Sequence, residues 1–177
     1  MRAFLAIPVP EALADALDPL IDLPNVRAAD SLHLTLHFLG EVRDAVLAEV
    51  WEDVTTIELR PLTLTLGALD TLDMGKGGAV VVHVVPDSAL IDLHDALARR
   101  LRRAGLDLPR RRFRPHITVA RHRHLTGADA ERLASALGRA ARPVGQAAAE
   151  RLVLYQSLLH PDRAEYHELD HLDFPRD

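Results

Sequence analysis

The chain has 177 residues, of which 48% are hydrophobic, and this length predicts one globular unit, residues 1–177, with a sizeable core. The absence of cysteine excludes disulfides, thiolate nucleophiles and cysteine-ligated zinc. The net charge of −5 argues against a protein that coats nucleic acid with its whole surface.

The first half of the chain predicts a strand, a helix, a second strand and a second helix. Residues 2–7 are apolar and β-compatible, and a helix over about 11–21 follows two prolines. Residues 31–39 alternate between leucine or phenylalanine and polar side chains, which predicts a strand with one polar face. Asp44 then caps a predicted helix over about 45–57. The N-terminus lacks a secretory-signal pattern and no apolar run could span a bilayer, so we expect a cytoplasmic protein.

The second half repeats this order of elements. Two strands, 62–66 and 79–85, flank a glycine-rich turn, and a helix over about 89–104 follows, capped by Asp87 or Ser88 and closed by Gly105. The remaining predicted elements are a strand at 116–120, a helix at about 129–141, and strands at 151–158 and 164–172 joined by a turn around Pro161 and Asp162. The mixture lacks strict βαβ alternation, which favours an α+β fold with antiparallel sheets.

Two predicted strands carry the same motif, His-x-Thr-x, 83 residues apart. Alternate residues of a strand point to the same side, about 7 Å apart, so His33 shares a face with Thr35, and His116 shares a face with Thr118. If both faces line one cleft, that cleft holds two imidazoles and two hydroxyls. One such motif is common on strands, and the second copy in the equivalent part of the chain is what favours catalysis over packing.

Two imidazoles suit the opening of a cyclic phosphodiester. One can take a proton from water while the other protonates the departing sugar oxygen, and imidazole is the side chain that supplies both forms near neutral pH. The threonine hydroxyls can donate hydrogen bonds to the non-bridging phosphate oxygens, whose charge grows in the transition state. No covalent intermediate is required.

Ten arginines and one acidic residue, Asp107, stand between positions 99 and 123. The arginines at 99–103 lie on a predicted helix, where such residues usually form a solvated face. Those at 110–114 run directly into the second motif, where contact with an anion and exposure to solvent are equal alternatives. Arg114, two residues before His116, is the candidate substrate-binding residue of this group.

These motifs and their flanks resemble the 2H phosphoesterases, and within them the bacterial and archaeal RNA 2',3'-cyclic phosphodiesterases, also called 2'-5' RNA ligases. The resemblance covers nearly the whole chain. It is carried by residues 2–10, by Leu-His-Leu-Thr-Leu-His-Phe-Leu-Gly-Glu at 32–41, by Phe-Arg-Pro-His-Ile-Thr-Val-Ala-Arg at 113–121, and by residues 152–157.

The resemblance implies two pseudo-symmetric lobes, each an antiparallel sheet with helices outside, around a central cleft that holds both histidines. It implies hydrolysis of RNA 2',3'-cyclic phosphate ends to 2'-phosphates without a metal or another cofactor. It further implies His33 as the proton donor at the leaving 3' oxygen and His116 as the proton acceptor that activates water. Thr35, Thr118 and Arg121 are then the phosphate ligands. The residues alone do not distinguish the two imidazoles.

Three positions raise questions that the pattern leaves open. Simple alternation puts Arg121 on the face opposite His116, so a phosphate contact requires an irregularity in the strand. The family usually has lysine where this chain has His37, which alternation places on the face of His33, about 13 Å away and near an RNA backbone. Tyr155 and Phe113 are either core residues or platforms on which a base stacks.

Other histidines and a glycine-rich segment resemble sites only when they are considered alone. We interpret His122 and His124 as a polar strand exit and three C-terminal histidines (His160, His167 and His171) as surface residues. The segment from Gly75 to Gly78 lacks the Walker spacing and predicts a turn. Besides hydrolysis by a monomer acting on RNA ends, the open alternatives are a non-catalytic RNA-end binding module, 2'-5' RNA ligation and hydrolysis of small cyclic nucleotides.

Overall fold

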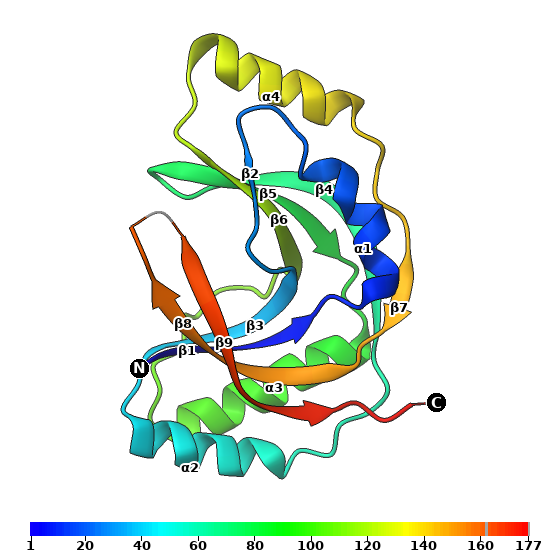
Figure 1. The fold of residues 1–177 in the computed structure, drawn as a ribbon. Coiled ribbons are helices and arrows are strands. Elements are labelled where there is room, and N and C mark those ends of the chain that lie inside the picture. Colours follow the sequence, from blue (N-terminus) through cyan, green and yellow to red (C-terminus); the bar gives the residue numbers. More distant parts are fainter. Residues whose placement is uncertain (162, 177) are drawn as a thin grey trace.

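The computed structural model describes residues 1–161 and 163–176 and has the predicted α+β class (Figure 1). Within these residues, nine strands pair antiparallel in the order β7-β4-β5-β6-β3-β1-β8-β9, with β2 paired to β6. The strands are β1 (Arg2–Pro8), β2 (Arg27–Ala28), β3 (His33–Glu41), β4 (Thr63–Asp73), β5 (Gly77–Val84), β6 (His116–Arg123), β7 (Gln146–Ala148), β8 (Arg151–Leu159) and β9 (Ala164–Asp173).

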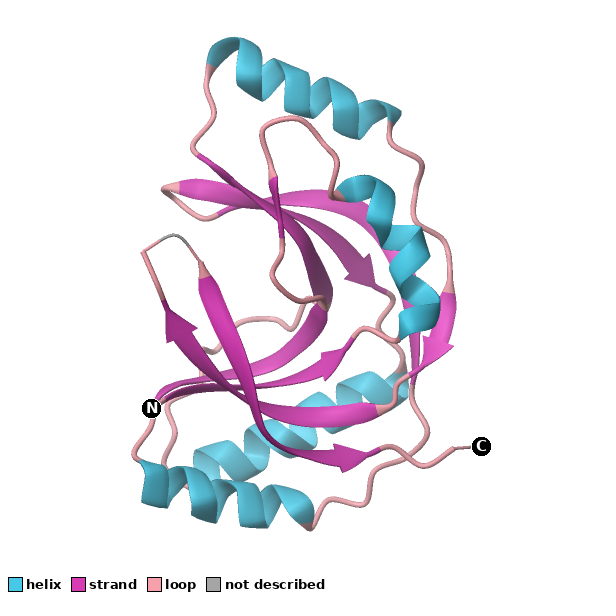
Figure 2. Ribbon diagram, in the orientation of Figure 1, coloured by secondary structure: helices cyan, strands magenta, loops and turns pink. Residues whose placement is uncertain are grey.

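Helices lie outside the strands (Figure 2). They are α1 (Glu11–Leu17), continued by a 3₁₀ turn (Asp18–Leu20), α2 (Asp44–Thr55), α3 (Ser88–Arg103) and α4 (Gly127–Arg139). Asp87 is the N-cap of α3, where its carboxylate accepts a hydrogen bond from the Leu90 amide at 2.8 Å. Asp44, by contrast, is the first residue of α2 and makes no capping hydrogen bond. None of the helices described is both long and apolar enough to cross a membrane.

The strands divide into two lobes that meet where β3 pairs with β6, at Leu34 and Ile117. The first lobe contains β1, β3, β8 and β9, and the second contains β2, β4, β5, β6 and β7. Each of the two central strands begins with a His-x-Thr-x motif. The junction of the lobes therefore brings the two motifs side by side, as the repeat in the sequence predicts.

The helices do not stay with the strands that precede them. Helix α3 follows β5 of the second lobe, yet it packs beneath the first lobe beside α2, where Arg103 forms an ion pair with Asp53 at 2.6 Å (Figure 1). Helix α1 follows β1 of the first lobe, yet it lies against the second lobe, where a Cβ on Gly145 would meet the Leu13 side chain at 3.0 Å. One hydrophobic core therefore runs through both lobes.

Both motif strands contain a bulge at the same place, the fourth residue of the motif. The β1 and β3 register shifts between Ala6–Thr35 and Leu5–His37, so Leu36 is the extra residue. The β5 and β6 register shifts between Val81–Thr118 and Val80–Ala120, so Val119 is the extra residue. A bulge reverses the inward and outward alternation of everything that follows it in the strand.

The bulge at Leu36 makes the predicted placement of His37 wrong. His37 is 8% exposed and points to the helix side of the sheet, where its Nε2 hydrogen-bonds to the His94 carbonyl at 2.8 Å. Its neighbour Phe38 takes the opposite face and is 62% exposed. His37 is therefore a packing residue between β3 and α3, remote from any RNA backbone on the other face.

Phe113 is also a packing residue. Of the two predicted alternatives, a core residue or a platform on which a base stacks, the second is therefore wrong. Its ring stacks on His94 with a centroid distance of 3.9 Å, and His94 stacks in turn on His37 at 4.2 Å. The three rings join the arginine-rich loop, α3 and β3. Burial lowers the pKa of His37 from 6.5 to about 4, because the charged imidazolium would lose its hydration there.

We expect this buried histidine to make the protein less stable in acid. Because the unfolded chain binds a proton at His37 below about pH 6.5 and the folded chain does so only near pH 4, stability is full above pH 6.5 and falls as the pH drops toward 4. The loss from this group alone is about 3 kcal/mol. Denaturant unfolding of the His37→Gln variant between pH 7 and pH 4.5 should show a smaller decrease than the wild type. The exposed control His124→Gln should behave as the wild type, and equal decreases in all three proteins would contradict the assignment.

Candidate active site

The four polar residues of the two motifs lie on one face of two paired strands. With Leu34 opposite Ile117 in an antiparallel pair, the next positions place His33 opposite Thr118 and His116 opposite Thr35. Diagonal positions in such a pair are about 7–8 Å apart, which is the separation expected for the two histidines. Each imidazole thus has a hydroxyl from the other motif across from it.

The second bulge turns Arg121 to the same face as His116. Alternation from His116 and Thr118 would have sent this side chain to the other side, but the extra residue Val119 reverses it, and both Val119 and Ala120 are fully buried. Arg121 is close enough to His33 for its charge to affect that ring. Within the described part of the chain, its guanidinium has one hydrogen-bond partner, a weak acceptor, the Met74 sulfur, at 3.6 Å. The strand therefore contains the irregularity that Arg121 needs in order to reach a phosphate on the face of His116.

His33 stands in an aromatic enclosure built by the first lobe. Its ring centroid lies 5.2 Å from that of Phe4, 6.1 Å from Tyr155 and 5.3 Å from Tyr166. Burial in this enclosure lowers the pKa of His33 from 6.5 to about 4, and the positive charge of Arg121 contributes to the shift. A hydrogen bond to the backbone of Ser31 acts in the opposite direction.

His116 is oriented by the residue that lies two positions before it. Its Nδ1 lies 2.7 Å from the Arg114 carbonyl oxygen, which can only accept a hydrogen bond. Nδ1 therefore carries the proton, and the lone pair of the neutral ring is on Nε2. This tautomer leaves Nε2 available as a proton acceptor.

The structure adds a third histidine that the sequence pattern did not single out. His83 on β5 pairs with His116, and their ring centroids are 6.5 Å apart. The Asp70 carboxylate contacts His83 Nε2 at 3.0 Å, and this hydrogen bond lowers the pKa of Asp70. The charge of Arg114 also lowers this pKa. A single polar residue inside the β-branched run at 79–85 was the only signal for His83.

Two neighbouring cavities open beside the motif face, between β2 and β6 on one side and β8 and β9 on the other. The smaller, about 240 Å³, is lined by Tyr155 and Tyr166 from the enclosure of His33. The larger, about 400 Å³, is lined by Arg121 and by residues of the β2 segment. Asp30, Arg163 and Ala164 line both, so the two cavities are adjacent. Tyr155 thus lies in the site as well as against Phe4, and Tyr166 is a site residue that the pattern did not indicate.

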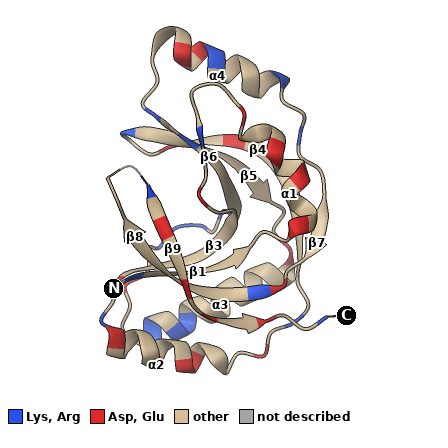
Figure 3. Cartoon of the chain, in the orientation of Figure 1, with Lys and Arg blue, Asp and Glu red and all other residues tan. Residues whose placement is uncertain are grey.

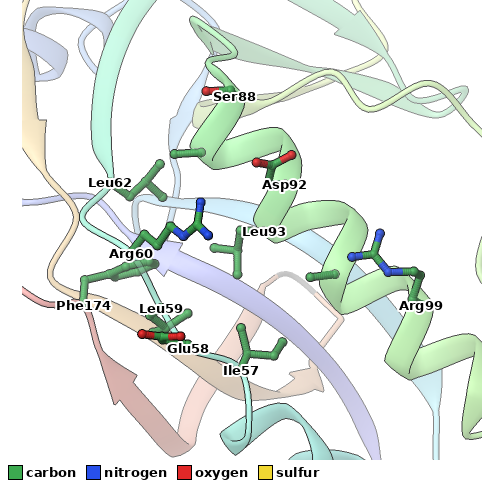
Figure 4. A pocket seen from close by; sticks show the side chains of 12 residues that line it. Ile57, Glu58, Leu59, Arg60, Leu62, Ser88, Asp92, Leu93, Arg99 and Phe174 are labelled. Atoms are coloured by element: carbon green, nitrogen blue, oxygen red, sulfur yellow. The ribbon is translucent and has the colours of Figure 1, made fainter.

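A separate cavity of about 300 Å³ lies on the other side of the first lobe, between α3 and the C-terminal segment (Figure 4). Its lining combines apolar side chains such as Leu93 and Phe174 with charges of both signs, including Arg60 and Asp92. Neither motif contributes to that lining. It has no geometric relation to the two histidines.

The remaining candidates have structural partners away from the motif face. Of the arginines predicted as a solvated face of the helix, Arg100 and Arg103 also contact Asp53 across the α2–α3 pair. In the C-terminal hairpin, His160 and His167 both contact the Glu165 carboxylate, at 3.1 and 2.8 Å. The segment around Gly75 is the predicted turn, between β4 and β5, whereas Asp162 of the other predicted turn lies outside the described residues.

Comparison of the sequence with known families gives one match that spans most of the chain. The model of the 2'-5' RNA ligase superfamily matches residues 9–161. The RNA 2',3'-cyclic phosphodiesterase of Archaeoglobus fulgidus is 26% identical over 128 residues, which are 68% of this chain and 72% of that protein. The protein of the same name from Bacillus subtilis is 23% identical over 128 residues, 67% of this chain and 69% of that protein.

Solved structures with the same fold extend over almost the full chain. The structure of E. coli LigT with 3'-AMP superposes with a TM-score of 0.73 at 26% identity, covering 99% of this chain and 98% of that one. A protein of Thermus thermophilus superposes with a TM-score of 0.74 at 20% identity, covering 98% of both chains. The second likeness concerns the fold alone.

Proposed function

Because this chain belongs to the 2'-5' RNA ligase superfamily, we propose that it hydrolyses RNA ends bearing a 2',3'-cyclic phosphate to 2'-phosphates. The observation that carries the proposal is the presence of two His-x-Thr pairs on one face of adjacent strands, beside a cavity lined by Tyr155 and Tyr166, whose rings pack around His33. The relatives from Archaeoglobus and Bacillus, both named RNA 2',3'-cyclic phosphodiesterases, support the same reaction. The 3'-AMP bound to E. coli LigT, a ribonucleotide with a phosphate on its sugar, is consistent with it.

In the proposed reaction, His116 takes a proton from water through Nε2 while the water oxygen attacks phosphorus. The bond from phosphorus to the 3' oxygen breaks, and His33 donates a proton to that oxygen, which leaves a 3'-hydroxyl and a 2'-phosphate. The fixed tautomer of His116 supports its role as the acceptor, because the Arg114 carbonyl occupies Nδ1 and leaves the Nε2 lone pair free.

Donation by His33 requires the bound substrate to raise its pKa. In the free protein the ring is neutral at pH 7, because burial and Arg121 hold its pKa at about 4. A phosphate bound beside His33 and Arg121 adds a negative charge and neutralises the arginine, and both effects favour the imidazolium. The substrate thus supplies the charge that makes its own proton donor effective.

Thr35, Thr118 and Arg121 complete the proposed anion site. A hydroxyl from each motif donates to a non-bridging oxygen, and Arg121 offers a guanidinium whose contact with the Met74 sulfur is weak. Tyr155, beside His33, offers a ring to the terminal base. All of these groups belong to the protein, so the proposed reaction needs no metal.

We expect the purified protein to convert an oligoribonucleotide with a 2',3'-cyclic phosphate into one with a 2'-phosphate at the same rate with and without EDTA. The products can be identified by ³¹P NMR, which separates the cyclic diester from the 2'- and 3'-monoesters. Binding without conversion would support the alternative of a non-catalytic RNA-end module. Formation of the 3'-phosphate would contradict the assignment of the leaving oxygen, and loss of activity in EDTA would contradict a reaction without metal.

A further inference from the structure

The larger of the two cavities beside the motifs is a basic groove, although the protein as a whole is acidic. Its arginines come from three segments that are distant in sequence: Arg27 from β2, Arg121 and Arg123 from β6, and Arg163 from the residue before β9. Among the described residues, Asp30 is the single carboxylate in the lining. Four guanidinium groups therefore converge on one space in a chain whose net charge is −5.

The distribution of charge in space supports this interpretation. The basic positions on β2, near the end of β6 and just before β9 lie near one another (Figure 3). Acidic side chains are frequent elsewhere, for example along α2, which is on the outer side of the first lobe. The groove is thus basic although the chain as a whole is acidic, and it is separate from the arginines of α3 and of residues 110–114, which do not line it.

Much of this positive charge is available to a ligand. Arg27 pairs with Asp30 at 2.7 Å, and Arg163 has a carboxylate, Glu165, at the long distance of 3.6 Å. Arg121 has the Met74 sulfur, and among the described residues no carboxylate lies within 4.0 Å of Arg121 or Arg123. Guanidinium groups without a close anion bind phosphate well, because they donate two parallel hydrogen bonds to it.

The groove adjoins the proposed catalytic site. Asp30, Arg163 and Ala164 line both cavities, and the smaller one reaches Tyr155 and Tyr166 beside His33. A cyclic phosphate can occur only at the 3' end of an RNA, so the rest of the chain must leave the site on one side. The basic groove adjoins the cavity beside His33 and offers positive charge to that part of the chain.

We propose that this groove binds the phosphodiester backbone of the nucleotides that precede the cyclic end, with Arg123 and Arg163 as specificity-determining residues for RNA over mononucleotides. The inference rests on the proposed function and adds the direction of the bound RNA. A positively charged groove that follows the backbone, next to aromatic rings that accept bases, is a common way to bind single strands without sequence preference. Arg121 belongs to the phosphate at the reaction centre, and the other arginines serve the phosphates before it.

The test compares an oligoribonucleotide ending in a 2',3'-cyclic phosphate with a 2',3'-cyclic mononucleotide. In the double variant Arg123→Gln/Arg163→Gln, kcat/KM for the oligonucleotide should fall at least about tenfold, and kcat/KM for the mononucleotide should stay within about twofold of the wild type. The slope of log kcat/KM against log salt for the oligonucleotide should become less negative by about 1.4, the loss of two phosphate contacts to a single strand.

The matched control removes two arginines of α4, in Arg132→Gln/Arg139→Gln, with the same change in net charge. These residues contact Asp129 and Ser135 of their own helix, and we expect no change with either substrate. Equal losses in both double variants would show a general effect of net charge and would contradict the proposal that the groove binds the RNA backbone. Unchanged oligonucleotide kinetics in the first variant would overturn it as well.

Binding measured apart from turnover separates this inference from the proposed function. Fluorescence anisotropy with an oligonucleotide ending in a 2'-phosphate should show weaker binding by the Arg123→Gln/Arg163→Gln variant and unchanged binding by the α4 control. If the wild type hydrolyses neither substrate but this difference in binding is present, the proposed function is wrong and RNA binding by the groove is supported. If the wild type and both variants bind the oligonucleotide equally, the groove does not bind RNA, whatever the hydrolysis assay shows.

Discussion

Replacing either motif histidine by alanine is expected to lower kcat by about two to four orders of magnitude, the usual contribution of one general acid or base. In the proposed reaction His33 and His116 each have their own proton-transfer role, and the third histidine of the site, His83, is held by Asp70. The measurement is single-turnover hydrolysis of the cyclic-ended oligonucleotide by His33→Ala and His116→Ala. Thermal unfolding of each variant should remain cooperative, and the exposed control His124→Ala should retain full activity.

The same two variants assign acid and base. The wild-type profile of kcat/KM against pH should be bell-shaped, with one limb from each imidazole. Loss of the proton acceptor in His116→Ala should remove the decrease at low pH, and loss of the proton donor in His33→Ala should remove the decrease at high pH. The reverse result would exchange the two roles. Activity near the wild-type level in either variant would defeat the two-histidine mechanism altogether.

Replacing Thr118 by valine is expected to have the next largest effect, a decrease in kcat of about 10²-fold to 10³-fold. Valine keeps the shape and the β-branch, so the strand should be preserved while the hydroxyl that we propose as a donor to the phosphate oxygen is lost. The loss should appear in kcat more than in KM, because the hydrogen bond strengthens as charge develops on the oxygen.

Thr63→Val is the matched control for this substitution. Thr63 is an exposed strand residue of β4 that pairs with Ala148, at a distance in the sheet from both motifs. We expect unchanged kinetics and stability. A loss confined to KM in Thr118→Val would mean that the hydroxyl contributes only to ground-state binding, and equal activity of the two variants would remove Thr118 from the anion site.

The sequence predicted the parts of this fold that depend on local pattern. The alternation at 31–39 predicted β3, and Asp87 with Gly105 predicted the ends of α3, because caps and amphipathic periods act over a few residues. The two copies of His-x-Thr-x identified the strands that meet at the lobe junction. Short strands that exist only through their partners, such as β2 and β7, gave no local signal.

What could not be predicted is the alternation after each motif. Leu36 and Val119 are ordinary strand residues, and no glycine or proline at either position announces a bulge. The bulge in β3 follows from its pairing with β1 on one side and with β6 of the other lobe on the other side. The bulge in β6 follows in the same way from its pairing with β5 and with β3. This one feature made the placement of His37 wrong and turned Arg121 into the site. The stacking of Phe113 on His94 depends on contacts between residues distant in sequence, so the pattern could not predict it either.

The exchange of helices between the lobes has a mechanical consequence. Each lobe is covered in part by a helix that follows a strand of the other lobe, as α1 and α3 do, so the two lobes share one core. A protein of this kind cannot swing open at a hinge without exposing apolar surface in both halves at once. The spacing between the paired imidazoles is therefore preset by the same packing that keeps the chain folded, and the substrate arrives at a rigid frame.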